Sequence, residues 1–128
     1  MAAFPAVILL EGELGAGKTV FCRGIARVLG IEGPVQSPTF PVLLEYEGNL
    51  PLYHFDLYRL ADSEEFDLIG GEDILCGDGS YGSGISVIEW PERLDWPDRR
   101  WVSPCLRVCF RMDKGSDYRE REIEIRRL

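Results

Sequence analysis

Hydrophobic and polar positions follow one another along this chain with periods that indicate both strands and helices. The run Val7–Leu10 is continuously apolar and ends in Glu11, which is typical of a buried strand. From Lys18 to Leu29, apolar residues recur at roughly helical spacing and Gly30 follows, so this segment predicts a helix. The chain therefore opens with a strand, a glycine-rich turn and a helix.

The middle of the chain alternates between turn-rich and apolar segments. Prolines and a glycine make Glu32–Pro41 a loop. Two apolar segments, Val42–Tyr46 and Leu52–Leu57, predict strands that are separated by a turn. The acidic sequence DSEE resembles a capping box and predicts a short helix over 62–69. Glycine, aspartate and serine then dominate Gly70–Gly84, which we expect to be a mobile loop.

The last third of the chain begins with another buried strand, predicted at Ile85–Ile88 and again followed by an acid, Glu89. A turn-rich connector, Pro91–Asp98, comes next. Apolar residues then alternate with charged ones on both sides of a turn at Lys114–Ser116, so we predict a terminal hairpin. Buried strands mixed with helices and a polar-faced hairpin predict an α/β fold, with a mixed, largely parallel sheet and an antiparallel C-terminal hairpin.

Composition narrows the class of protein. The 128 residues are 45% hydrophobic and 28% charged, which is ordinary globular usage, and we expect a single domain over residues 1–128. The longest apolar run, Ala6–Leu10, is too short to span a bilayer, so no membrane partner is expected. With 14 basic and 22 acidic residues the net charge is −8, which argues against direct, tight binding to nucleic acid.

The 4 cysteines do not form the C-x-x-C pairs of zinc sites or redox centres. No basic segment followed by a long apolar run opens the sequence, so we expect a cytoplasmic location and reduced thiols. In that setting the cysteines are expected to act as small, buried or half-buried hydrophobes. They are Cys22, Cys76, Cys105 and Cys109.

One segment matches the phosphate-loop pattern G-x-x-x-x-G-K-[ST] in full. Its glycines let backbone N–H groups point at phosphate oxygens, and the helix that follows presents its positive end to the same charge. Lys18 would reach the β- and γ-phosphates, and the Thr19 hydroxyl would coordinate Mg²⁺. The alternative is a glycine-rich turn that precedes an ordinary surface lysine. The predicted nucleotide-binding residues are Gly12, Glu13, Leu14, Gly15, Ala16, Gly17, Lys18 and Thr19.

A phosphate loop needs a carboxylate at a neighbouring strand end to hold Mg²⁺ and its waters. Asp56 and Glu89 are the candidates, and both would lie beyond the same sheet edge if their strands run parallel to the first. Alternatively, each acid caps its strand or pairs with a nearby arginine. His54 shares a face with Asp56 by strand alternation, and a structural role is favoured for it over catalysis.

The sequence SPTF is the other distinctive segment, and it lies in the loop between the first helix and the next strand. Switch loops of phosphate-loop proteins sense the γ-phosphate at this position, so Thr39 could offer its hydroxyl to Mg²⁺ or to the phosphate. A rigid proline turn explains the same segment equally well. The sequence leaves both readings open.

In that order, the blocks GELGAGKT, SPTF, YHFDLYRL and IEWPERL make the chain resemble the TsaE (YjeE) family of bacterial P-loop ATPases. The resemblance covers about Leu10 to Leu94 and implies a P-loop NTPase-like three-layer sandwich. It also implies a protein that binds ATP and Mg²⁺ and is required to form threonylcarbamoyladenosine in tRNA. Members of the family work with the TsaD–TsaB protein complex and are thought to reset it by ATP hydrolysis.

The resemblance also assigns roles to single residues. It implies that Asp56 and Glu89 are catalytic and that, with Thr19, they hold the metal. Thr39 matches a switch-like threonine, and Trp90 matches the tryptophan that follows the family's acid. The whole loop from Gly12 to Thr19 matches the family's nucleotide site.

Two departures from the family pattern stand out. Only Met1–Pro5 precede the first strand, where family members usually carry a further segment that includes a helix, so the contacts to adenine and ribose are not assigned. The stretch Gly70–Gly84 is also looser than the family pattern and is interpreted as an insertion.

We therefore expect a magnesium-dependent ATPase whose own activity is weak and is raised by its partner. A small-molecule or nucleotide kinase is one alternative, although the candidate lid Gly70–Gly84 contains no arginine or lysine. A nucleotide-dependent binding module with negligible hydrolysis is the other. Substitutions at Lys18 and Asp56 distinguish these functions.

Overall fold

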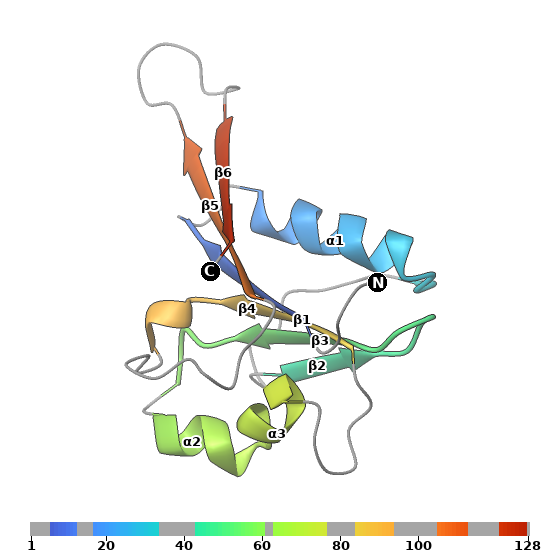
Figure 1. Cartoon of the computed structure of the whole chain (residues 1–128), viewed down its shortest axis with the longest axis vertical. Helices are drawn as coiled ribbons and strands as arrows, with labels where there is room; N and C mark the ends of the chain where they lie inside the picture. The colour runs from blue at the N-terminus through green and yellow to red at the C-terminus, as the bar shows by residue number, and fades with distance from the viewer. Residues whose placement is uncertain are drawn as a thin grey trace.

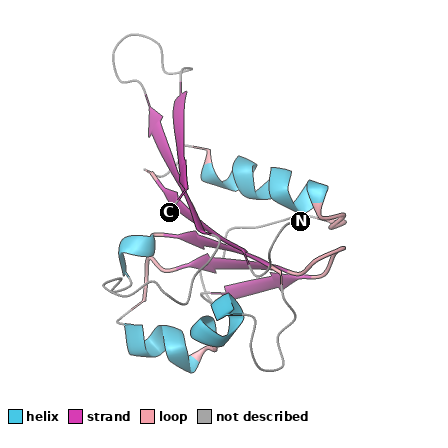
Figure 2. Cartoon of the chain, viewed as in Figure 1, coloured by secondary structure: helices cyan, strands magenta, loops and turns pink. Residues whose placement is uncertain are grey.

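The computed structural model describes residues 6–12, 17–33, 43–60, 63–76, 84–93, 105–112 and 121–127. Within these ranges the strands form one six-stranded sheet. One helix covers one face of this sheet and two short helices cover the other (Figures 1 and 2). In chain order the elements are β1 (Ala6–Glu11), α1 (Lys18–Val28), β2 (Leu43–Tyr46), β3 (Leu52–Asp56), α2 (Ser63–Leu68), α3 (Gly71–Cys76), β4 (Ile85–Glu89), the 3-10 turn η1 (Pro91–Arg93), β5 (Cys105–Met112) and β6 (Arg121–Arg127).

The sheet has a parallel centre and antiparallel edges. Its strand order is β2-β3-β4-β1-β5-β6. The pairs β3–β4, β4–β1 and β1–β5 are parallel, whereas β2 and β6 pair antiparallel with β3 and β5. The predicted α/β class, the largely parallel sheet and the C-terminal hairpin are thereby confirmed. The predicted hairpin turn, Lys114–Ser116, lies outside the described residues.

Strand alternation divides the apolar side chains between the two faces of the sheet. The face under α1 is packed with buried residues from both the sheet and the helix, among them Leu10, Cys22, Ala26, Val87 and Val108. The opposite face packs against α2 and α3 and contains Leu9, Phe55, Phe66, Ile74 and Ile88. Both faces of the central strands are therefore dry, as a parallel sheet requires.

The first helix agrees with its prediction. It spans Lys18–Val28, Leu29 forms its C-cap, and Gly30 closes it with a φ of 73°. The Gly30 N–H donates to the carbonyl of Arg27 at 3.1 Å, which satisfies one of the carbonyls at the helix end. The predicted strands agree with the observed ones to within a residue or two at each end.

The prediction of a continuous mobile loop over Gly70–Gly84 is wrong in its first part, where α3 forms. Ile74 and Leu75 of this helix are buried against the sheet. The helix begins at Gly71, where a Cβ would lie under 3.0 Å from the ring of Phe66, so glycine permits a close approach that any other residue would prevent. Residues 77–83 lie outside the described part of the chain.

Candidate functional site

Three neighbouring parallel strands end at one edge of the sheet. β1 leads into Gly12, β3 ends at Asp56 and β4 ends at Glu89. The pairing register places Glu89 opposite Leu10 on one side and opposite Asp56 on the other. Both acids are the last residues of their strands, and β3, β4 and β1 run parallel, so the condition for their meeting at one sheet edge is fulfilled. Ligands of open α/β sheets bind beyond this edge, so both carboxyl groups stand where a ligand is expected.

The described start of α1 has the features of an anion-binding site. Gly17 is the N-cap of the helix, with φ 111° and ψ 9°, a left-handed conformation that favours glycine. Neither an N-cap side chain nor an acidic residue in the first turn competes for the N–H groups at this end of α1. The first N–H groups of a helix have no intrahelical acceptor, and they carry the positive end of its dipole.

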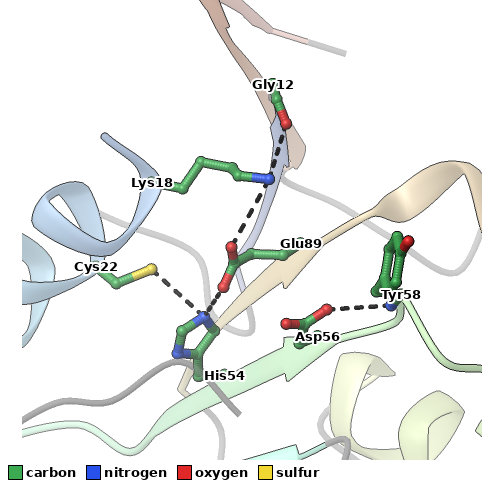
Figure 3. A network of polar contacts seen from close by, with 7 residues as sticks. All are labelled: Gly12, Lys18, Cys22, His54, Asp56, Tyr58 and Glu89. Carbon is green, nitrogen blue, oxygen red and sulfur yellow. Dashed lines mark hydrogen bonds and ion pairs between the residues drawn. The ribbon is translucent and has the colours of Figure 1, made fainter. Parts of the chain in front are cut away.

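Lys18 places its ammonium group at the centre of this edge (Figure 3). Its Nζ donates to the carbonyl of Gly12 at 2.8 Å and lies 3.9 Å from Glu89 Oε1. The same nitrogen stands over the ring of Trp90, 4.6 Å from its centroid. Because the side chain is buried, these three neighbours compensate the charge that burial removes from water.

Glu89 connects this lysine to the interior of the sheet. Its other oxygen, Oε2, lies 2.6 Å from Nε2 of His54, and both side chains are buried. Cys22 Sγ on α1 lies 3.6 Å from the same nitrogen. The four side chains form one chain of polar contacts from the helix start to the interior of the sheet (Figure 3).

The thiol of Cys22 is unreactive in this position. Burial, reinforced by the nearby charge of Glu89, raises the pKa of Cys22 to about 12. The thiol therefore stays protonated, and only a thiolate acts as a nucleophile or a metal ligand. Cys22 and Cys109 are free cysteines, and the expectation that they are buried or half-buried small side chains is confirmed for both.

Asp56 is half-buried at the end of β3. Its Oδ1 accepts the backbone N–H of Tyr58 at 3.1 Å, which fixes the carboxyl group in the turn that follows the strand. Burial raises the pKa of Asp56 above its ordinary value, and the Tyr58 hydrogen bond opposes this shift. The charge of Glu89 raises the pKa further and that of Lys18 lowers it, so the two acids influence each other.

Trp90 follows Glu89 in a strained backbone conformation. Its φ is 60°, and within the described ranges it is the one residue other than glycine with a positive φ. The indole ring lies 5.0 Å from the ring of Tyr58 and also covers the Lys18 ammonium group. These ring contacts stabilise the positive φ of Trp90 in the turn after β4.

Oxygen donors at this edge suit magnesium. The Thr19 hydroxyl and the carboxyl groups of Asp56 and Glu89 are hard ligands, and Mg²⁺ in proteins is usually held by one or two carboxylates together with phosphate oxygens and waters. No group of three or more His, Cys, Asp or Glu side chains in the described part of the chain is arranged to hold a metal by itself. The oxygen donors named above are of the kind that would share a magnesium ion with a phosphate ligand.

Several predicted site residues cannot be placed. Glu13, Leu14, Gly15, Ala16 and Thr39 lie outside the described residues, so their roles stay predictions. The structure brings together Gly12, Lys18, Glu89 and Trp90 through the contacts given above. Gly17 precedes Lys18 as the N-cap of α1, and Asp56 lies on the strand beside Glu89.

Sequence reasoning missed the contact between His54 and Glu89. The strand register pairs Asp56 with Glu89, and His54 lies two residues earlier on the same face of β3. Alternation within the strand gave this face correctly. The partner of His54 follows only from the strand order, which places β4 beside β3.

Comparison with known proteins gives the relationships of the chain. The family model "Threonylcarbamoyl adenosine biosynthesis protein TsaE" matches residues 1–123. A tRNA threonylcarbamoyladenosine biosynthesis protein TsaE from Treponema pallidum is 49% identical over 88 residues, which are 69% of this chain and 62% of that protein. Its counterpart from Haemophilus influenzae is 43% identical over 118 residues, or 91% of this chain and 68% of that protein.

The matched part of this chain covers less than two thirds of the length of some relatives. It spans 62% of the Treponema pallidum protein and 55% of a similarly named protein from Synechocystis, which is 49% identical over 89 residues. No helix in the described ranges has both the length and the apolar composition to cross a membrane. The resemblance that the four sequence blocks indicate is confirmed along nearly the whole chain, and the chain belongs to the TsaE family.

Proposed function

We propose that this chain binds Mg²⁺–ATP and hydrolyses it in support of tRNA threonylcarbamoyladenosine biosynthesis, acting on a TsaD–TsaB complex. The observation that carries the proposal is the position of the Lys18 ammonium group. It lies at the start of α1, beside the Gly12 carbonyl and 3.9 Å from Glu89, at the carboxyl edge of parallel strands. This combination of helix start, lysine and carboxylate supports binding of a nucleotide polyphosphate.

Each side chain at the edge has a role that its position supports. The first turn of α1 offers N–H groups to phosphate oxygens, and Lys18 exchanges its contact with the Gly12 carbonyl for one of those oxygens. Thr19, Asp56 and Glu89 would hold Mg²⁺, which when bound neutralises charge that develops on the transferred phosphoryl group. The two carboxyl groups also orient the attacking water.

The acidic composition supports a division of labour in tRNA modification. A net charge of −8 disfavours contact with the phosphate backbone of tRNA, so the chain handles ATP while its protein partners hold the tRNA. The matched names of the relatives refer to the same pathway. A cytoplasmic location follows from this role and stays a prediction.

ATPase assays of the chain alone and of the chain mixed with TsaD–TsaB test the proposal. We expect slow hydrolysis by the isolated chain and faster hydrolysis in the mixture, because a partner would complete the enclosure of the nucleotide. Equal rates in the two samples would contradict the partner role. A chain that does not bind ATP at all would contradict the whole proposal.

Two substitutions separate an ATPase from a nucleotide-dependent binding module. Lys18→Ala is expected to abolish ATP binding, because it removes the ammonium group that contacts the phosphates. Asp56→Ala is expected to keep binding and to stop hydrolysis. If Asp56→Ala leaves turnover intact, the catalytic role of Asp56 is wrong.

No observation favours a kinase over an ATPase. Kinases that share this loop close an arginine-rich lid over the phosphates, and the segment Gly70–Gly84 contains neither arginine nor lysine. Its first part is also occupied by α3, which packs against the sheet on the face opposite α1. Transfer of phosphate to a small metabolite, tested over a panel of acceptors, would reverse this preference.

A further inference from the structure

His54 is a polar side chain with no exposed surface, in the middle of the sheet and under α1. Burial of an imidazole in an apolar interior is costly unless its nitrogens form hydrogen bonds. Its Nε2 meets Glu89 Oε2 at 2.6 Å, and none of the described residues pairs with its Nδ1. Within the described residues the ring therefore has its polar contacts through Nε2, and the contact with Glu89 is the shorter of the two.

The contact assigns the proton on this ring. An ionised carboxylate only accepts hydrogen bonds, so opposite ionised Glu89 the Nε2 atom carries the hydrogen and donates it. Cys22 Sγ lies farther from the same nitrogen, at 3.6 Å, and packs beside the ring without receiving that hydrogen. His54 is thus oriented toward one atom, Oε2 of Glu89.

This arrangement gives the two oxygens of Glu89 different neighbours. Oε2 is held by His54 inside the sheet, whereas Oε1 faces the Lys18 ammonium group at 3.9 Å. A carboxylate anchored through one oxygen cannot rotate freely about its last torsion. The carboxyl group therefore loses its conformational entropy during folding and not when a ligand binds.

We propose that His54 is a positioning residue, which anchors Glu89 through Oε2 so that Oε1 is aimed at the magnesium–phosphate ligand. The inference rests on the proposed function, because it assumes that the site takes a magnesium nucleotide. It adds a role for a residue that touches neither the nucleotide nor the metal. Partners of metal-binding carboxylates commonly change metal affinity by about 10–100-fold when they are removed.

Binding of a fluorescent ADP analogue, with Mg²⁺ and with EDTA, measures this role without relying on hydrolysis. We expect His54→Leu to weaken binding in Mg²⁺ by about tenfold and to change binding in EDTA by less than about twofold. Phe55→Leu is the matched control, because Phe55 is equally buried on the same strand and faces the opposite side of the sheet. This control is expected to lose stability and to keep the full response to Mg²⁺.

A second pair of variants tests the same role if His54→Leu does not fold. The amide nitrogen of glutamine reaches the position of Nε2, whereas that of asparagine reaches only the position of Nδ1. His54→Gln is therefore expected to keep most of the Mg²⁺ response, and His54→Asn to lose it. Circular dichroism melting checks that each variant is folded before its nucleotide affinity is compared.

Three results would overturn the inference. They are a normal Mg²⁺ response in His54→Leu or His54→Asn, an equal loss in His54→Gln and His54→Asn, and the same loss in the Phe55→Leu control. If the unaltered chain binds the nucleotide and the variants behave alike, only the role of His54 is wrong. If the unaltered chain binds no nucleotide in either buffer, the proposed function is wrong and the inference with it.

Discussion

The first residue of α3 provides a sharp test of the packing beneath the sheet. A Cβ on Gly71 would lie under 3.0 Å from three atoms of the Phe66 ring. That ring also packs against Phe55, with centroids 5.2 Å apart, so it has little room to move. Overpacking of this kind costs about 1–3 kcal/mol, and a helical alanine recovers roughly 0.5–1 kcal/mol. We therefore expect Gly71→Ala to lower the free energy of unfolding by about 0.5–2 kcal/mol.

Gly24→Ala is the matched control for this substitution. Gly24 lies in the middle of α1 and is exposed to solvent, and a Cβ there would have no neighbouring atom within 4 Å. The same chemical change should raise stability by about 0.5–1 kcal/mol. Urea denaturation followed by far-UV circular dichroism gives both values, provided that the m-value is unchanged. Adding Phe66→Leu to Gly71→Ala should recover much of the loss, because the two sites are in contact. A Gly71→Ala chain as stable as the unaltered one would refute the packing of α3 on Phe66.

Two further predictions concern charge at the site. Because burial raises the pKa of Asp56, its ionised form opposes folding at neutral pH, and this penalty disappears as the pH falls below the ordinary aspartate range. At neutral pH, Asp56→Asn should therefore unfold at a higher urea concentration than the unaltered chain. This advantage should disappear near about pH 3, where the side chain at position 56 is uncharged in both proteins. The same difference in urea midpoint at both pH values would count against a raised pKa of Asp56. Cys22, with a pKa of about 12, should resist iodoacetamide at neutral pH in the folded chain and react once urea unfolds it, as peptide mass mapping would show. Labelling of folded chain at Cys22 would contradict its burial.

The sequence predicts most of this fold because its central strands are largely apolar runs that end in an acid. The apolar runs that became β1 and β4 could be assigned from composition and length alone. The helix α3 could not, since its six residues are fewer than an isolated helix needs and begin with a glycine. Its stability comes from burial of Ile74 and Leu75, a tertiary effect that local propensity does not contain.

The sequence predicts candidate site residues where they belong to a contiguous motif or stand at the end of an apolar strand. The motif predicts the phosphate loop, and that role stays a prediction. The strand ends predict that Asp56 and Glu89 lie at the same sheet edge, and the strand register confirms this position. The pairing of His54 with Glu89 depends on which strands are neighbours and in which register, and a single sequence does not state either. Contacts between residues 35 positions apart are the kind that only the folded chain reveals.

The antiparallel edges of the sheet have a consequence for how the molecule opens. β1 and β4 are hydrogen-bonded on both sides and covered on both faces, so their amides exchange with solvent only when the whole domain unfolds. Among the described strands, β2 and β6 have a neighbour on one side only, and we expect their amides to exchange through local opening. Glu89 ends β4, one of these slowly opening strands, so its position relative to Gly12 at the end of β1 does not depend on local opening of the described edge strands.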